Sequence, residues 1–150
     1  MRRLLLAILC LLTLLATGCE KEQDVTRDPK YGNFATVTGQ WKTKQPLVLV
    51  QTNSHIPWQI FTKQYYDDYL TASTKPLATL PPGTAIQVEY MMRYPSFEAD
   101  TFAWTGTLVT GPYAGRPLEL YQKLFTYTSS PANSGAIYGP WQVDPAQLGK

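Results

Sequence analysis

Residues 80–91 read LPPGTAIQVEYM, and this stretch decides the fold of the chain. Pro82 presets the φ angle of a turn and Gly83 tolerates the positive φ that follows, which is the order that a type II turn prefers. After the turn, apolar side chains occupy every second position, at Ile86, Val88 and Tyr90. Because successive side chains of a strand point to opposite faces, this alternation predicts a β-strand with one buried face.

Four other segments have strand character because they are rich in apolar, β-branched or aromatic residues. They are residues 34–38, 47–50, 101–110 and 118–128. Two glycines and two prolines in 111–117 predict a hairpin loop between the last two strands. Residues 40–45 are expected to form a surface hairpin loop between the first two.

Residues 58–70 carry both strand and helix periodicity. Alternation at the start predicts a strand over 59–61. The aromatic residues that follow recur at intervals of three and four, which predicts a short helix over 63–70. The chain has 12 prolines, spaced so that few other windows could hold a long helix. The expected fold is therefore all-β, a small barrel or compact β-sandwich of five to six short strands with one short helix near 63–70.

Residues 77–122 are similar to bacterial SH3-like modules. The similarity consists of the turn and strand at 80–88, a strand pair containing Gly106, and the loop 111–115 before Leu118. It implies an SH3-like barrel, a fold that commonly binds peptides or cell-wall fragments in an aromatic-lined groove.

The N-terminus has the order of an export signal. Arg2 and Arg3 precede an apolar run over 4–15, and small residues follow before Cys19. The apolar run has about 12 residues, whereas a helix needs roughly 20 to span a bilayer. A charged segment follows the cysteine, so a cleaved signal is favoured over a retained transmembrane helix.

Residues 1–19 resemble the signal of bacterial lipoproteins, because Gly18-Cys19 matches the end of their lipobox. The family usually has Leu three residues before the cysteine, where this chain has Ala16. The resemblance implies that residues 1–18 are removed and that Cys19 is lipidated. Two or more acyl chains would then anchor the protein stably in a membrane. Glu20 is not the aspartate linked to inner-membrane retention in some of these proteins, which favours an outer-membrane anchor facing the periplasm.

The expected organisation after the signal has three parts. Residues 19–33 are polar, contain no clear buried pattern and are expected to be a lipidated flexible tether. Residues 34–128 form the β domain. Residues 129–150 form a tail rich in Pro, Ser and Gly that docks partly on the domain, through Tyr138 and Trp141.

Composition excludes several functions. Loss of Arg2 and Arg3 lowers the 13 basic side chains to 11, equal to the 11 acidic ones, so the basic patch needed for nucleic-acid binding is absent from the sequence. Cys10 leaves with the signal and Cys19 becomes a thioether, so no thiol remains for catalysis or metal binding. His55 is the only histidine. We therefore expect no metal site and no cofactor.

Candidate catalytic groups are few. His55 could be combined with Ser54 and Asp67 into a triad, but the sequence has no nucleophile elbow. Asp67-Asp68 supplies too few ligands for calcium, which takes six to eight oxygens. Glu89 and Glu119 alternate with apolar neighbours and are expected to face solvent. The sequence thus predicts no catalytic residues and a protein that is not an enzyme.

Aromatic residues are abundant, at 13% of the chain. Most are expected to fill the core, while some can line a groove because tyrosine and tryptophan suit interfaces that stay partly wet. The candidate binding groove comprises Trp58, Tyr65, Tyr66, Tyr69, Tyr94, Phe97 and Trp104. The expected function is a non-enzymatic envelope lipoprotein that binds another protein as an accessory or assembly factor. The alternatives are a module that binds cell-wall glycan (peptidoglycan) and an inhibitor or immunity protein of a lytic or toxic enzyme.

Overall fold

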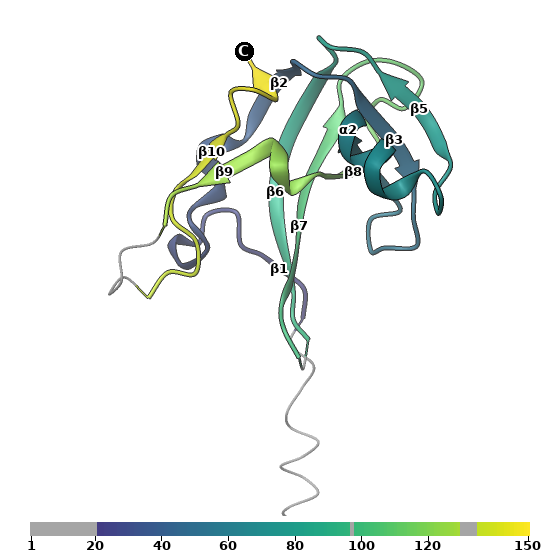
Figure 1. The fold of residues 1–150 in the computed structure, drawn as a ribbon. Helices are drawn as coiled ribbons and strands as arrows, with labels where there is room; N and C mark the ends of the chain where they lie inside the picture. Colours follow the sequence, from purple (N-terminus) through teal and green to yellow (C-terminus); the bar gives the residue numbers. More distant parts are fainter. Residues whose placement is uncertain (1–20, 97, 130–134) are drawn as a thin grey trace, which may run out of the picture.

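The computed structural model describes residues 21–96, 98–129 and 135–150, and this part of the chain is mostly β (Figure 1). It contains one large open sheet of nine strands, a separate two-stranded sheet and short helical segments. The strands are β1 (Gln23–Asp24), β2 (Gly39–Thr43), β3 (Leu47–Gln51), β4 (Trp58–Thr62), β5 (Pro76–Leu80), β6 (Ala85–Tyr94), β7 (Thr101–Leu108), β8 (Pro117–Leu120), β9 (Phe125–Tyr127), β10 (Trp141–Val143) and β11 (Leu148–Gly149). The helical segments are η1 (Pro29–Tyr31), η2 (Phe34–Val37), α2 (Lys63–Tyr65), η3 (Tyr66–Leu70) and η4 (Gln122–Leu124).

The strand predicted from residues 85–91 is confirmed as part of β6, the longest strand described. Gly83 adopts the positive φ that the turn requires, at 86°. Ile86 and Val88 are fully buried as expected, but the register shifts between Val88 and Tyr90 when β6 pairs with β7. Such a bulge inserts one extra residue and reverses the alternation beyond it. Met91 therefore occupies the core position that the simple alternation predicted for Tyr90.

β6 and β7 form a long antiparallel hairpin that projects below the rest of the domain in Figure 1. Their backbones approach closely at Gly106, where an added Cβ would lie 2.4 Å from the carbonyl oxygen of Gln87. β7 pairs antiparallel with β8, which confirms the predicted pairing of the segments on either side of 111–117. This hairpin is the centre of the sheet.

The large sheet has the strand order β11-β2-β6-β7-β8-β4-β3-β5, and β1 pairs separately with β6. All pairs are antiparallel except β4 with β8, which makes the sheet mixed. The predicted closed barrel is wrong, because β5 and β11 end the sheet without pairing with each other. The predicted count of five to six strands is also wrong. Of the additional strands, β1 lies in the expected tether and β10 and β11 in the expected tail, whereas β2, β5 and β9 lie within the expected β domain.

The expected flexible tether is wrong for much of the segment from residue 21 to residue 33. Gln23 and Asp24 form β1, and Val25 and Tyr31 are each only 3% exposed. Asp28 caps η1 by accepting a hydrogen bond from the backbone N–H of Lys30 at 2.9 Å. The sequence signal was weak because these apolar residues are isolated among charged ones, and their burial comes from tertiary packing.

Residues 34–38 do not form the predicted strand. Phe34–Val37 is a short 3-10 helix, and Phe34 is fully buried against the rings of Phe125 and Trp141. The loop expected over 40–45 is wrong as well, because residues 39–43 form β2, which pairs with β6 and β11 rather than with β3. Tertiary pairing with β6 overrides the local pattern here. The strand and helix predicted within 58–70 are confirmed as β4 and the helical segments α2 and η3.

The C-terminal segment is more closely integrated than expected. Trp141 is 2% exposed, and its indole N–H donates to the backbone oxygen of Tyr31 at 2.7 Å. Tyr138 packs against the main core, as predicted, and Leu148 is also buried. β10 pairs with β9, and β11 extends the large sheet at β2. The two ends of the described chain are therefore joined through one core.

Phe34→Ala tests whether the segment before β2 belongs to this core. Loss of a fully buried phenylalanine leaves a cavity, so we expect the free energy of unfolding in urea to fall by about 3–5 kcal/mol. Tyr69→Ala is the matched control, because Tyr69 is 70% exposed and its loss should change stability by less than about 0.5 kcal/mol. Equal effects of the two substitutions would contradict the described packing of η2.

Candidate functional site

The large sheet has a second face, opposite the main core, and this face carries the candidate site. Along β4, Ile60 is fully buried in the main core, whereas its neighbours Gln59 and Phe61 point to the other face. On β3 the same face is covered by η3, where Val48, Val50 and Tyr66 form a small cluster with Phe61 packed against it. The aromatic segment 58–70 is thus split between the two faces.

The helical segment 63–70 positions two tyrosines on one side. It begins at Thr62, whose hydroxyl accepts a hydrogen bond from the backbone N–H of Tyr65 at 3.3 Å. Residues four apart on a helix are neighbours, and the Tyr65 and Tyr69 rings lie 5.0 Å apart. Lys63 and Asp67 make an ion pair of 2.6 Å on the exposed side. The acidic pair 67–68 thus lies on the helix surface.

Four aromatic side chains make a continuous cluster that we call the tyrosine cleft: Phe61, Tyr65, Tyr69 and Tyr121. The Tyr121 ring lies 4.7 Å from that of Tyr65 and 5.4 Å from that of Phe61. Burial raises the pKa of Tyr121, and the neighbouring Tyr65 and Tyr69 add to the shift. Tyr69 is 70% exposed, so the cluster presents a ring to solvent.

Two adjacent cavities open at the tyrosine cleft and share Tyr121. The larger, of about 260 Å³, is lined by Thr62, Gln64, Tyr65, Asp68, Tyr69, Tyr121, Lys123 and Gln147. The smaller, of about 210 Å³, is lined by Gln59, Ile60, Phe61, Trp104, Glu119, Leu120, Tyr121 and Gln122. Both cavities are therefore lined by aromatic rings together with amide side chains.

Two buried polar atoms among these lining residues lack a hydrogen-bond partner in the described part of the chain. They are the Oε1 atom of Gln147 in the larger cavity and the Nε1 atom of Trp104 in the smaller one. Buried polar groups are nearly always paired with protein or ordered solvent. Both atoms have almost no exposed surface, so they lie behind the cavity walls, and the Trp104 ring packs in the main core against Trp141.

Glu119 lies beside the cleft and is only partly accessible to solvent, so the predicted solvent-facing position is wrong for this residue. Its carboxylate accepts a hydrogen bond from the Gln59 amide at 2.5 Å and lies 3.5 Å from the Ser54 hydroxyl. Burial raises the pKa of the Glu119 carboxyl above its ordinary 4.5, although these two hydrogen bonds oppose the shift. β8 pairs with β4 and β7 on either side, which accounts for this burial.

His55 does not form a triad with the residues considered from sequence. Its ring stacks on that of Tyr94, with centroids 4.3 Å apart and an angle of 6°. The Ser54 hydroxyl donates to the backbone oxygen of Ile56, and Asp67 pairs with Lys63. Burial raises the pKa of Tyr94, with smaller contributions from Glu22, Tyr90 and Glu119. The loop 52–57 is therefore held by packing and local hydrogen bonds.

The structure brings only part of the predicted groove together. Tyr65, Tyr69 and Trp104 line the two cavities. Tyr66 points inward, and its hydroxyl donates to the backbone oxygen of Thr74 at 2.6 Å. Trp58 packs instead against Tyr113 and beneath the guanidinium of Arg116. Tyr94 stacks on His55, while Phe97 and the lipidation residue Cys19 lie outside the described residues.

Sequence reasoning missed Tyr121 as a site residue, and it left Phe61 outside the proposed groove. Both can be found once the strands are aligned, because Ile60 and Leu120 pair between β4 and β8 and face the core. The next residues, Phe61 and Tyr121, are then neighbours with rings 5.4 Å apart, Phe61 packing against the small cluster under η3 and Tyr121 against the main core. The glutamines that line the cavities come from separated segments and have no shared sequence pattern.

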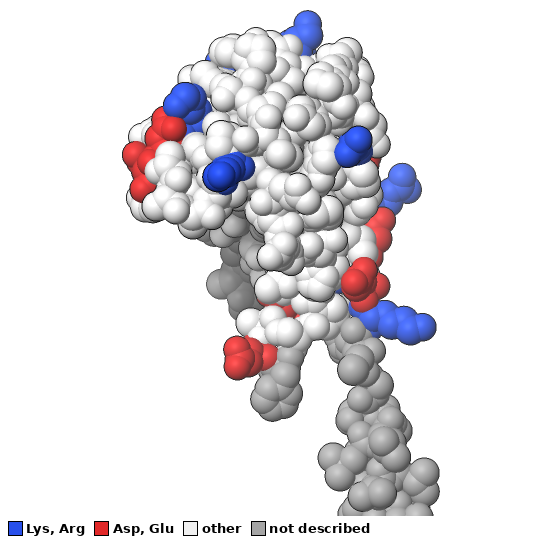
Figure 2. Space-filling model, turned by 90° about the vertical axis from the view of Figure 1, so that its right-hand side faces the viewer, with Lys and Arg blue, Asp and Glu red and all other residues white. Residues whose placement is uncertain are grey.

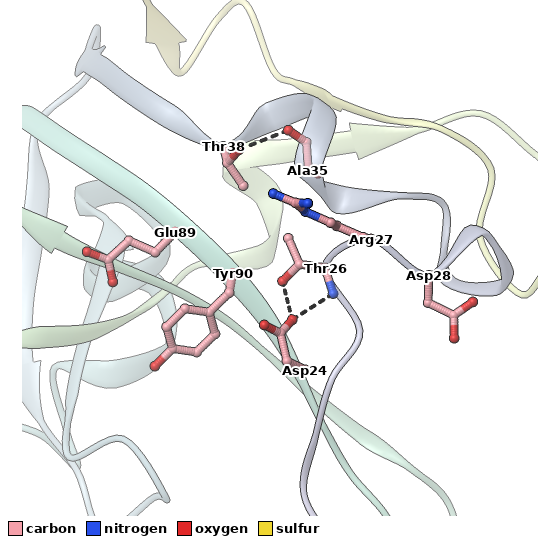
Figure 3. Close-up of a pocket in the computed structure, with 8 residues that line it drawn as sticks. All are labelled: Asp24, Thr26, Arg27, Asp28, Ala35, Thr38, Glu89 and Tyr90. Carbon is pink, nitrogen blue, oxygen red and sulfur yellow. Dashed lines mark hydrogen bonds between the residues drawn. The ribbon is translucent and has the colours of Figure 1, made fainter.

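A different hollow, of about 450 Å³, lies where β1 and η2 meet β6 (Figure 3). The Asp24 carboxylate in it accepts hydrogen bonds from the backbone N–H and hydroxyl of Thr26, at 2.9 and 2.5 Å. Figure 3 shows the carboxylates of Asp28 and Glu89 pointing away from each other. The hollow therefore does not gather its acidic groups around one point, and its central contacts hold β1 in place.

Comparison with known proteins gives no relative: no family model, curated protein or solved structure matches the chain. Within the described residues, no helix is both long and apolar enough to cross a membrane. The same residues hold no group of three or more His, Cys, Asp or Glu side chains that could bind a metal ion together.

Glu119→Gln tests the burial of this carboxylate. Because the folded protein holds the Glu119 proton to higher pH than the unfolded chain does, its stabilising contribution is present below pH 4.5 and is lost as pH rises through the raised folded pKa. The glutamine variant stays neutral. The measurement is the free energy of unfolding in urea, as the value for the variant minus the value for the natural protein. We expect this difference to be more positive well above pH 4.5 than below it.

Glu98→Gln is the control for the loss of one exposed carboxylate from the surface. The difference between the two variants isolates the effect of burial at Glu119. A pH profile for Glu119→Gln that coincides with that of the control would show that Glu119 is not desolvated.

Proposed function

We propose that this protein is a non-enzymatic, lipid-anchored envelope protein that binds a protein partner through the tyrosine cleft. The observation that supports the proposal most strongly is the aromatic cluster itself, with Tyr69 70% exposed and three more rings packed behind it. Tyrosine is enriched in the energetically important centres of protein interfaces, where a rigid ring covers a large area at low entropic cost. The partner would act with this protein in an assembly or accessory role.

The size of the cavities favours a protein partner over a small-molecule ligand. Cavities of about 260 and 210 Å³ are smaller than the usual 300–1,000 Å³ of a small-molecule site. Each has the size to accept individual side chains of a partner. Lys123 and Asp68 supply the polar rim that interfaces usually have.

Charged side chains at the cleft lie on its helix and at its rim, whereas three neighbouring strands carry none. The strands β3, β4 and β5 contain no Asp, Glu, Lys or Arg. Figure 2 shows the side of the molecule that carries β3 and β5 as a mostly uncharged surface on which charged side chains stand as separate groups. Depletion of charge is the compositional feature of interface centres. A partner surface of mixed apolar and polar character would fit it.

The anchor is proposed from the lipobox resemblance of residues 1–19, with Cys19 carrying the lipid and the domain facing the periplasm from the outer membrane. SH3-like modules commonly bind peptides in an aromatic-lined groove, so the similarity of residues 77–122 to these modules supports peptide binding. The open sheet of this protein differs from their closed barrel. A lytic or toxic enzyme is one class of partner, which would make the protein an inhibitor or immunity protein. We propose no cofactor and no nucleic-acid partner.

A second candidate ligand is cell-wall glycan. Four glutamines, Gln59, Gln64, Gln122 and Gln147, line the two cavities beside the aromatic rings. An amide both donates and accepts hydrogen bonds, so it can pair with the hydroxyl groups of a sugar. The faces of tyrosine rings offer apolar surface for the C–H groups of the same sugar. Peptidoglycan would then be the ligand in place of a protein.

Tyr69→Ala tests the cleft as the binding surface. Lipidated protein is captured from cross-linked envelope extract, and the proteins recovered with it are quantified. The partner should be lost or bind about 30-fold more weakly with Tyr69→Ala, since a hot-spot residue contributes about 2 kcal/mol or more. Tyr127→Ala is the matched control, because Tyr127 is 46% exposed on β9 and lies outside the cleft.

Equal recovery of the partner with both variants would contradict the proposal. Binding to purified, insoluble cell wall that depends on Tyr69, without any protein lost from the capture, would replace the protein partner by glycan.

A further inference from the structure

We propose that β1 holds the domain close to its lipid anchor, because the linker from Cys19 to Gln23 is very short. The end of the β6–β7 hairpin then faces the membrane surface. This inference rests on the proposed lipidation of Cys19. It adds an interaction surface, the hairpin end, and a partner for it, the lipid headgroups around the anchor.

β1 is fixed to the lower part of β6 by backbone and side-chain contacts. Gln23 and Asp24 pair with Arg93 and Met92, and the Gln23 side chain accepts a hydrogen bond from the Arg93 guanidinium at 2.9 Å. The next residue, Val25, donates its backbone N–H to the carbonyl oxygen of Met91 at 2.9 Å. The first residues of the described chain therefore belong to the sheet.

The length of chain between the lipid and the sheet is short. Gln23 follows Cys19 by four residues, and a fully extended chain spans at most about 3.3–3.6 Å per residue. The Cα atom of Gln23 then lies within about 14 Å of the Cα atom of Cys19. A flexible tether over the whole of 19–33 would have allowed any orientation of the domain relative to the membrane, whereas a linker that ends at Gln23 does not.

The position of β1 along β6 decides which end of the domain is near the lipid. Gln23 pairs with Arg93, one residue before β6 ends at Tyr94. The other end of β6, at Ala85, is eight residues away, or about 26 Å at 3.3 Å per residue. Figure 1 shows the β6–β7 hairpin projecting from the rest of the domain, with β1 beside it. The hairpin end is thus the membrane-proximal end.

Charge at this end neither repels the headgroups strongly nor draws the hairpin into them. Arg93 pairs with Asp100 at 2.6 Å, and the other charged residues described near the hairpin end are Lys21, Glu22, Glu98 and Lys30, whose charge acts on Asp100. Three basic and three acidic side chains balance. The short linker from Cys19 to Gln23, rather than electrostatic attraction, would therefore hold the hairpin end at the lipid surface.

Energy transfer to the membrane tests this orientation. Full-length lipidated protein carrying Glu98→Cys or Lys42→Cys is labelled with a donor dye and reconstituted in phosphatidylethanolamine and phosphatidylglycerol vesicles that contain an acceptor lipid. Both residues are exposed, and lipidation of Cys19 leaves each variant with one free thiol. Glu98 lies at the hairpin end, whereas Lys42 pairs beside Ala85 at the far end. We expect clearly higher transfer from position 98 than from position 42.

Equal transfer from the two positions, or higher transfer from position 42, would overturn the orientation. A second variant with eight Gly and Ser residues inserted between Glu22 and Gln23 should bring the two transfer values together. No change on insertion would also overturn the proposal. A chain that does not float with vesicles, or that floats equally well as Cys19→Ser, would overturn the lipid anchor itself and the orientation with it. The tyrosine-cleft proposal would be unaffected by either result.

Discussion

One edge of β6 is paired by two separate segments, and the rest of the structure depends on this arrangement. β2 covers the half that begins at Ala85, and β1 covers the half that ends near Tyr94. Between them, the Thr26 hydroxyl accepts a hydrogen bond from the buried backbone N–H of Met91 at 2.9 Å. A buried backbone group left without a partner would cost about 1–3 kcal/mol, so this side chain completes the edge where neither strand reaches.

The same strand connects the two proposed functions of the molecule. On one edge, β6 holds β1 and therefore the chain that leads to the lipid anchor. On the other edge, β7 and then β8 and β4 follow, and the tyrosine cleft lies beside β4 and β8, between the main core and the small cluster under η3. Because these are rigid paired strands, an anchor at one side and a binding cleft at the other would keep a fixed relation. A partner would then meet the cleft in a defined orientation to the membrane.

The sequence predicted elements whose signal is local. Alternation at Ile86 and Val88 identified β6, and the three- and four-residue spacing after Phe61 identified the helix that carries Tyr65 and Tyr69. It could not predict the bulge at Val88/Tyr90, which arises from pairing with β7. Nor could it predict β1, whose two residues have no alternation and whose stability comes from β6. Tyr121 was missed for the same reason, since only the alignment of β8 with β4 brings it to the cleft.

Native-state hydrogen exchange at Val25 and Met91 tests the central claim, that β1 is a folded part of the sheet. The amide of Val25 bonds to the Met91 carbonyl oxygen and the amide of Met91 bonds to Thr26. If the edge of β6 is completed as described, both amides should exchange as slowly as those of the β6–β7 ladder, through cooperative opening of the domain. Exchange of Val25 at the rate of an unprotected chain, with the β6–β7 ladder still protected, would show that residues 21–26 are a free tether and would contradict the account.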